Sequence, residues 1–278
     1  MKRFWECLKI KQDEEAVQDR KPSDAGPVNF ALIATQRTGS TFLEELLSSP
    51  DDCYVFPELF SANDPFHIPK KCISNGYLAQ RSVDDFQESV LASRYAIYRF
   101  KNAPEVALGS HLMWNQVSDS LVERLIADGY KLVLLERENI LAIYRSAKFA
   151  REKGLSHVRS AGGPRERSKV EFEEPEFERF FAKISAFYSR KKRFASQYPN
   201  QAMSVTYREL AHHPVAMANS IRAFLGLEAS ETIRSDLQKR QSSNPLDGFS
   251  NPEHVAQTME RLGLTRFLVP EISDSLEP

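Results

Sequence analysis

The sequence has few cysteines, almost no net charge and no long apolar run, and each of these absences excludes a class of protein. Its three cysteines, Cys7, Cys53 and Cys72, are an odd number at spacings that match no zinc pattern, so we expect reduced thiols. No run of about 18 apolar residues occurs, which predicts no membrane span. The net charge of −1 excludes a surface that coats nucleic acid or anionic lipid, so any anion site must be local.

The chain is long enough to bury one substantial core, because 41% of its 278 residues are hydrophobic. Residues 1–26 are charged and run into a Pro- and Gly-containing turn, so we expect a flexible N-terminal arm followed by a single domain over 27–278. The N-terminal apolar stretch is broken by Glu6 and Lys9 before a signal core can form. A cytoplasmic location is the resulting expectation.

The stretch 28–47, VNFALIATQRTGSTFLEELL, predicts a strand, a tight loop over 35–41 and a helix. Such a turn directs backbone N–H groups and the positive end of the helix dipole at one point, which favours a bound phosphate or sulfate. Gly39 permits close backbone approach, and we expect Thr41 and Glu44 to form a capping box.

Strands alternate with helices along the rest of the chain, which predicts an α/β, P-loop-like three-layer fold with a central, mainly parallel β-sheet flanked by helices. We expect the segments 61–104 and 154–173 to be insertions that shape the substrate pocket, the second as a lid. The predicted strands are 28–34, 53–56, 105–114, 131–135 and 202–206, and the predicted helices are 42–47, 82–94, 116–127, 140–153, 174–194, 214–225, 230–238 and 252–262, with a turn over 207–210.

A second junction of strand and helix is a second candidate anion site. Arg137 follows the buried strand 131–135, and Ser146 lies in the next helix.

The first loop lacks the lysine of a nucleoside triphosphate loop, G-x-x-x-x-G-K-[ST], and the strand 131–135 ends in Glu-Arg-Glu rather than a magnesium-binding Asp. These two features disfavour a Mg-ATP enzyme, although a kinase-like phosphotransferase stays open.

The two junctions together resemble the sulfotransferases that use 3′-phosphoadenosine 5′-phosphosulfate (PAPS). The loop over 36–41 resembles their 5′-phosphosulfate loop, in the version with Arg in place of Lys, and 137–146 resembles their 3′-phosphate motif. The segment 205–227 is similar to the family's tyrosine turn and following helix. The segments 239–246 and 251–253 resemble the cofactor-covering tail of bacterial carbohydrate sulfotransferases, including nodulation-factor enzymes, and 109–116 with Phe56-Pro-Glu is similar to the mycobacterial trehalose type.

This resemblance, which covers roughly 28–262, implies roles for individual residues. PAPS is the implied donor, adenosine 3′,5′-bisphosphate (PAP) the product, and no metal is implied. Glu58 is the implied base for the acceptor proton, His111 is the rival base, and Arg37 acts on the transferring group. The implied cofactor-binding residues are Gln36, Arg37, Thr38, Gly39, Ser40, Thr41, Arg137, Ser146, Tyr207, Lys239, Arg240 and Gln241.

The acceptor is less defined than the donor. A carbohydrate is implied by the relatives that the motifs resemble, a small natural product with a hydroxyl or an amine is the alternative, and a non-catalytic nucleotide-binding protein of the same fold stays open. No nucleic-acid partner is expected, and a homodimer is an open assembly. The basic residues outside the motifs are read as solvent-facing charges: Arg145, Lys148 and Arg151 on one helix, and His157, Arg159, Arg165 and Arg167 in the loop after it.

Overall fold

The computed structural model describes residues 28–58, 107–153, 169–237 and 244–271, together with Glu88, Leu91 and Ala92. At its centre is an open five-stranded sheet in the order β2-β3-β1-β4-β5, in which every neighbouring pair is parallel. The strands are β1 (Asn29–Ala34), β2 (Cys53–Phe56), β3 (Ala107–Met113), β4 (Lys131–Glu136) and β5 (Ala202–Thr206). Between their polar end residues the central strands β1 and β4 are apolar and buried, as expected for strands whose two faces are both covered by helices.

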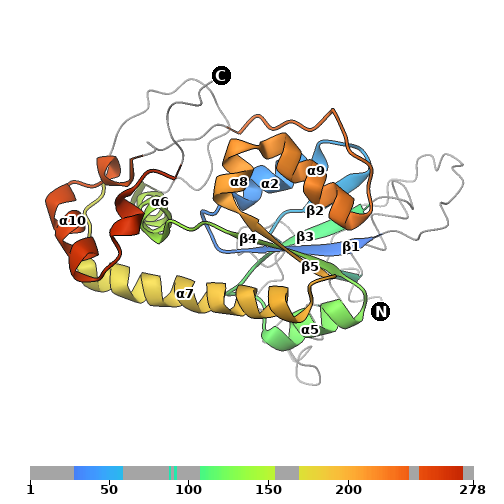
Figure 1. Cartoon of the computed structure of the whole chain (residues 1–278), viewed down its shortest axis with the longest axis horizontal. Coiled ribbons are helices and arrows are strands. Elements are labelled where there is room, and N and C mark those ends of the chain that lie inside the picture. Colours follow the sequence, from blue (N-terminus) through green and yellow to red (C-terminus); the bar gives the residue numbers. More distant parts are fainter. Residues whose placement is uncertain are drawn as a thin grey trace, which may run out of the picture.

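Helices form a layer on each side of this sheet (Figure 1). On one face lie α2 (Ser40–Ser48), α8 (Tyr207–His212) and α9 (Pro214–Leu225), and on the other lie α5 (Asp119–Ala127) and the second half of α7 (Glu174–Gln197). Strand β1 shows why both layers are needed: Leu32 packs among the residues of α2 and α9, whereas Ile33 packs among those of α5. Successive side chains of a strand point to opposite faces, so the expected three-layer fold is confirmed.

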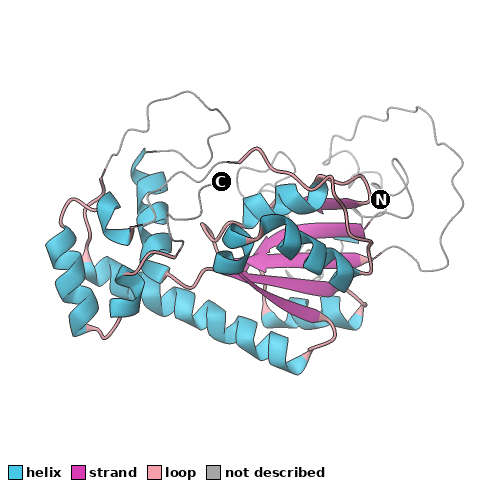
Figure 2. Ribbon diagram, turned by 45° about the horizontal axis from the view of Figure 1, so that its top comes forward, coloured by secondary structure: helices cyan, strands magenta, loops and turns pink. Residues whose placement is uncertain are grey.

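A third apolar cluster is formed by helices that lie beyond the end of the sheet. Figure 2 shows these helices beside the strands. The cluster joins α6 (Ile140–Lys153) and the first half of α7 to η1 (Pro245–Gly248), α10 (Pro252–Arg261) and η2 (Thr265–Leu268). The buried Tyr144 lies at its centre, with the ring of Phe177 at a centroid distance of 5.5 Å and that of Phe249 at 6.3 Å. This cluster places the C-terminal part of the chain beside the turn that follows β4.

The strand order places a topological switch point between β1 and β4. From β1 the chain passes through α2 toward β2 on one side, and from β4 it passes through α6 and α7 to β5 on the other side. The loops after these two neighbouring strands therefore diverge, and ligands of open α/β sheets bind at such a switch point, outside the carboxyl ends of the strands.

Most of the predicted elements are confirmed within the described ranges, including Gly226 as the C-cap of α9. The predicted helix 230–238 is wrong, because 230–237 is irregular. There the hydroxyl of Ser230 accepts a hydrogen bond of 3.2 Å from the backbone N–H of Thr232, a local bond that competes with helix formation. The turn predicted at 207–210 is instead the short helix α8, and a capping box of Thr206 and Glu209 caps its N-terminus.

Two further expectations need correction. The prediction of a capping box of Thr41 and Glu44 is wrong. Helix α2 begins at Ser40, its N-cap Gly39 has a left-handed backbone conformation, and no side chain caps the helix. At the end of the predicted lid 154–173, Val170 and Phe172 are buried in the third cluster, so this part is not a surface loop. Residues 154–168, the arm 1–26 and most of the insertion at 61–104 lie outside the described residues. Across the described part of the chain, no helix has the length and apolarity to cross a membrane.

Candidate functional site

The carboxyl ends of all five strands meet at one edge of the sheet, and each is followed by a polar or charged residue. Arg37 follows β1, Glu58 follows β2, Gln116 follows β3, Arg137 follows β4 and Tyr207 begins directly after β5. Parallel strands bring these positions to the same side. Four of the five were predicted as site residues, and Gln116 was not singled out.

The loop after β1 is a tight turn built for close approach. The buried Thr38 donates its hydroxyl to the carbonyl oxygen of Thr35 at 2.7 Å. Among the residues that the structure describes, Arg37 is the only non-glycine with a positive φ, 65°, and Gly39 follows with φ 87°. A Cβ on Gly39 would lie 2.8 Å from Cδ2 of Tyr207, so the aromatic ring closes one side of the turn.

Helix α2 presents its first turn to this edge. Neither a side-chain cap nor an acidic residue occupies its N-terminus, so the backbone N–H groups and the dipole there suit an anion. Ser40 is buried and Thr41 half-buried in this turn, while Gln36 is exposed on the loop before it.

The two predicted phosphate sites form one continuous cluster. Nε of Arg37 donates a hydrogen bond of 2.8 Å to Oγ of Ser146 on α6. Nη1 of Arg137 donates to the backbone carbonyl oxygen of Arg37 at 3.2 Å. The loop after β1 and the turn after β4 are therefore joined both through a side chain and through the backbone.

Arg137 is held from several sides. The hydroxyl of Tyr188 on α7 accepts from the Arg137 backbone N–H at 3.1 Å and donates to its carbonyl oxygen at 2.8 Å. The guanidinium carbon lies 4.4 Å from the centre of the Tyr207 ring. Glu271, close to the end of the described chain, forms an ion pair with Arg137 at 2.6 Å.

The charges around Arg137 define the protonation states at this junction. Burial acts to lower the pKa of Arg137, but the neighbouring carboxylate of Glu271 outweighs it and the pKa is raised. Burial also raises the pKa of Tyr207, which therefore stays a neutral phenol against the cation.

Arg145 was predicted from the sequence to face solvent, and this prediction is wrong. It is buried, and its Nη1 donates to the carbonyl oxygens of Asn244 at 2.8 Å and Pro245 at 3.0 Å. Burial, and then the charge of Arg137, lower the pKa of Arg145 to about 10. Arg145 thus ties the C-terminal segment to α6, one residue before Ser146. Leu141, four residues earlier on the same helix face, is also buried and could have signalled this burial.

Lys148 is also buried rather than solvent-facing. It forms ion pairs with Glu173 and, at 3.0 Å, with Glu176. Of the three basic residues predicted to face solvent on α6, only Arg151 does so.

The two candidate bases occupy different environments. Glu58 is half-buried after β2, and its Oε1 accepts a hydrogen bond of 2.6 Å from Nε2 of Gln116. His111 is 3% exposed within β3, and its Nδ1 lies 3.3 Å from Oε2 of Glu44 on α2. Nε2 of His111 has no hydrogen-bond partner among the described residues.

Several predicted residues cannot be placed. Lys239, Arg240 and Gln241 lie outside the described residues, as do the four basic residues predicted in the loop from His157 to Arg167. The described chain resumes at Asn244, which Arg145 holds. No group of three metal-ligating side chains occurs within the described ranges, and independence from metal stays a prediction.

Comparisons with known proteins bear on the family and the fold of this chain. The model of the sulfotransferase family matches residues 30–231. Nodulation protein H of Rhizobium meliloti is 25% identical over 231 residues, covering 80% of this chain and 86% of that protein. The sulfotransferase domain of the Synechococcus PCC 7002 olefin synthase has a TM-score of 0.50 at 13% identity and covers 94% of each chain. A sulfotransferase from Alicyclobacillus acidocaldarius has a TM-score of 0.47 at 19% identity, over 88% of this chain and 96% of its own. Because the family model spans well over half of the sequence and both anion loops, this chain belongs to the family of PAPS-dependent sulfotransferases.

Proposed function

We propose that the protein transfers the sulfuryl group of PAPS to a hydroxyl or amine of a carbohydrate or another small molecule. The observation that carries the proposal is the linked pair of cationic junctions, in which Arg37 bonds to Ser146 and Arg137 bonds to the backbone of Arg37. A nucleotide with anionic groups on both its 5′ and 3′ positions matches two adjoining anion sites at one edge of the sheet.

The residues present fit the two ends of the donor. The loop over 35–41 and the uncapped start of α2 suit the 5′-phosphosulfate, because backbone N–H groups converge there. Arg137 and Ser146 suit the 3′-phosphate. The ring of Tyr207 lies against Gly39 and under Arg137, so we assign it to bracing both junctions; its contact with adenine stays a prediction.

Bound PAPS supplies the electrophilic sulfur for an in-line displacement with a loose transition state, and the protein supplies charge and position. The guanidinium of Arg37 stabilises the negative charge that develops on the sulfonate and bridging oxygens. Its bond to Ser146 keeps the guanidinium between the two anion sites. We propose that these cationic side chains neutralise the developing charge without a metal ion.

We assign the proton-accepting role to Glu58. It is half-buried at the edge where an acceptor can approach, and Gln116 orients its carboxylate through a bond of 2.6 Å. The amide of Gln116 is itself fixed, since its Oε1 accepts from the backbone N–H of Met113 at 3.1 Å. His111 is buried two residues before the end of β3 and faces Glu44. This position favours a supporting role for His111 rather than direct contact with the acceptor.

Calorimetry with PAP in the presence of a metal chelator tests the donor assignment. We expect binding without metal, followed by transfer from PAPS to members of a carbohydrate and small-molecule acceptor panel. Binding of Mg-ATP alone would favour a kinase-like phosphotransferase. Binding of PAP without turnover across the panel would favour a non-catalytic nucleotide-binding protein.

A further inference from the structure

The carboxylate of Glu271 occupies the fork of Arg137. Its Oε2 lies 2.8 Å from Nε and 2.6 Å from Nη2 of that guanidinium. We propose that Glu271 competes with the 3′-phosphate of the nucleotide for Arg137, and so sets how strongly the protein prefers 3′-phosphorylated nucleotides. This inference rests on the proposed donor.

Two other parts of Arg137 are also engaged, and the fork formed by Nε and Nη2 is the part that already holds an anionic group. Nη1 donates to the carbonyl oxygen of Arg37, and the planar face stacks on the ring of Tyr207. The Nε and Nη2 edge is the part of a guanidinium that binds carboxylate or phosphate oxygens in parallel. A phosphate on Arg137 and the carboxylate of Glu271 therefore require the same N–H groups.

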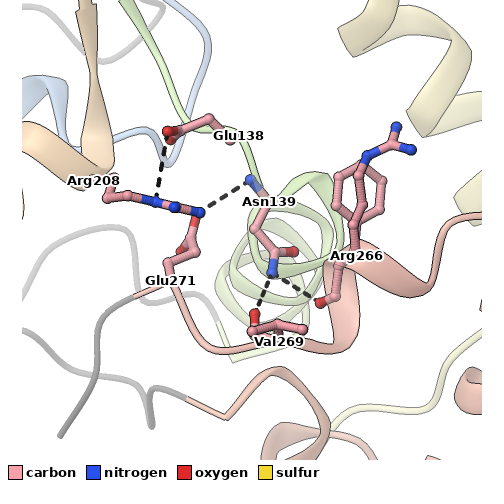
Figure 3. A pocket seen from close by; sticks show the side chains of 7 residues that line it. Glu138, Asn139, Arg208, Arg266, Val269 and Glu271 are labelled. Carbon is pink, nitrogen blue, oxygen red and sulfur yellow. Dashed lines mark hydrogen bonds and ion pairs between the residues drawn. The ribbon is translucent and has the colours of Figure 1, made fainter.

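The second oxygen of Glu271 also occupies an anion position. Its Oε1 accepts a hydrogen bond of 3.2 Å from the backbone N–H of Asn139, directly before α6 begins at Ile140 (Figure 3). Glu271 thus combines an arginine fork with the start of a 14-residue helix, the donor set that suits a phosphate. The carboxylate stands where we place the 3′-phosphate.

The surroundings allow Glu271 to leave without unfolding the site. The side-chain amide of Asn139 holds the preceding segment by donating to the carbonyl oxygens of Phe267 at 2.8 Å and Val269 at 3.3 Å. Glu271 also lines a pocket of about 130 Å³, which is shared with Arg208 and Arg266 (Figure 3). A displaced carboxylate can move into this pocket, whose lining includes Arg208, while Asn139 keeps its hydrogen bonds to the preceding segment.

The competition affects two classes of nucleotide differently. PAP must displace Glu271 from Arg137, whereas adenosine 5′-monophosphate lacks the 3′-phosphate and leaves the ion pair intact. Removing the carboxylate therefore strengthens PAP binding and leaves binding of the monophosphate unchanged. Because charge-assisted hydrogen bonds are at stake, we expect PAP affinity to rise about tenfold in Glu271→Gln.

Calorimetry on the full chain tests this inference with PAP and adenosine 5′-monophosphate as ligands. Glu271→Gln is compared with wild type and with Glu260→Gln, which alters an exposed glutamate on α10. Glu271→Ala repeats the test without a side-chain amide, and circular dichroism establishes that each variant is folded.

The expected result is a higher PAP affinity in both Glu271 variants only, with the monophosphate affinity unchanged. Equal PAP affinity in wild type and the Glu271 variants, or equal gains for both nucleotides, overturns the competition and leaves the proposed donor standing. Absence of PAP binding in every protein overturns the donor assignment and this inference together.

Discussion

Arg37 and Ser146 are 109 positions apart in the sequence and are joined by a hydrogen bond of 2.8 Å from Nε to Oγ. The serine hydroxyl accepts from Arg37 and retains a proton that it can donate to an anion. A single side chain can therefore contact both Arg37, which we propose acts on the sulfonate, and the 3′-phosphate of the proposed donor. On this proposal the two ends of the nucleotide site are interdependent.

Replacing Ser146 by alanine should weaken PAP binding about tenfold, because a hydrogen bond to a charged group contributes about 1.5–3 kcal/mol and water replaces part of it. The matched control is Ser220→Ala, which removes a serine hydroxyl from the exposed side of α9. Calorimetry of both variants provides the measurement. A PAP affinity that is equal in Ser146→Ala and Ser220→Ala would contradict the assigned role.

Gly39 and Gly129 allow backbone strain to be separated from a steric clash. Both have positive φ, 87° and 83°, but a Cβ at Gly39 would lie 2.8 Å from Tyr207, whereas none of the described atoms lies within 4 Å of a Cβ at Gly129. Gly129→Ala should lower the free energy of unfolding by about 1–2 kcal/mol through strain alone and leave PAP binding intact.

Gly39→Ala should lower the free energy of unfolding further than Gly129→Ala and also weaken PAP binding, because the loop and the Tyr207 ring must move apart. Urea unfolding and calorimetry of the two variants measure both effects. If Gly39→Ala binds PAP as tightly as Gly129→Ala, the close packing of this loop is not needed for the nucleotide site.

The sheet and the two anion junctions could be predicted because their signals are local. The strand, loop and helix of 28–47 are contiguous, and Arg137 and Ser146 follow β4 within one supersecondary unit. The parallel pairing then follows from the alternation of strands with helices. Parallel strands have their carboxyl ends at one edge of the sheet, so the two junctions are expected at the same edge.

The parts that escaped prediction depend on contacts between distant segments. Glu271 reaches Arg137 across 134 positions, and nothing in the residues near Glu271 marks it as an ion-pair partner. The burial of Arg145 depends on a segment 99 positions later, so a helical pattern alone places it in solvent. At 230–237 helical spacing is present, but the chain is irregular. There the hydroxyl of Ser230 accepts a hydrogen bond from the backbone N–H of Thr232, and the hydroxyl of Ser235 donates one to Glu45.

Stability in acid should depend on Glu176. Burial acts to raise its pKa, but hydrogen bonds from Lys148, Arg151 and Tyr144 outweigh burial and lower the pKa of Glu176 from 4.5 to about 2. A lowered folded-state pKa adds stability that is present above pH 4.5 and is lost as the pH falls toward about 2.

The free energy of unfolding should therefore fall by about 2 kcal/mol more in wild type than in Glu176→Gln between about pH 6 and about pH 3. Urea unfolding at the two pH values measures this difference. Glu178→Gln, which changes an exposed glutamate on the same helix, should follow wild type. A constant gap between wild type and Glu176→Gln at both pH values would show that Glu176 titrates alike in the folded and unfolded chain.

Glu58 and His111 can be distinguished by turnover. Glu58→Gln keeps the shape of the side chain and its contact with Gln116 but cannot accept a proton, so kcat should fall by about 10²–10⁴ while PAP affinity stays within about twofold.

Gln116→Leu should lower kcat by about tenfold with the base still present, because the carboxylate loses its orienting bond. His111→Gln should have the smallest effect, since His111 is buried beside Glu44. Full activity in Glu58→Gln together with an inactive His111→Gln would transfer the base to His111, and the burial of that imidazole would then mean that the acceptor reaches below the edge of the sheet.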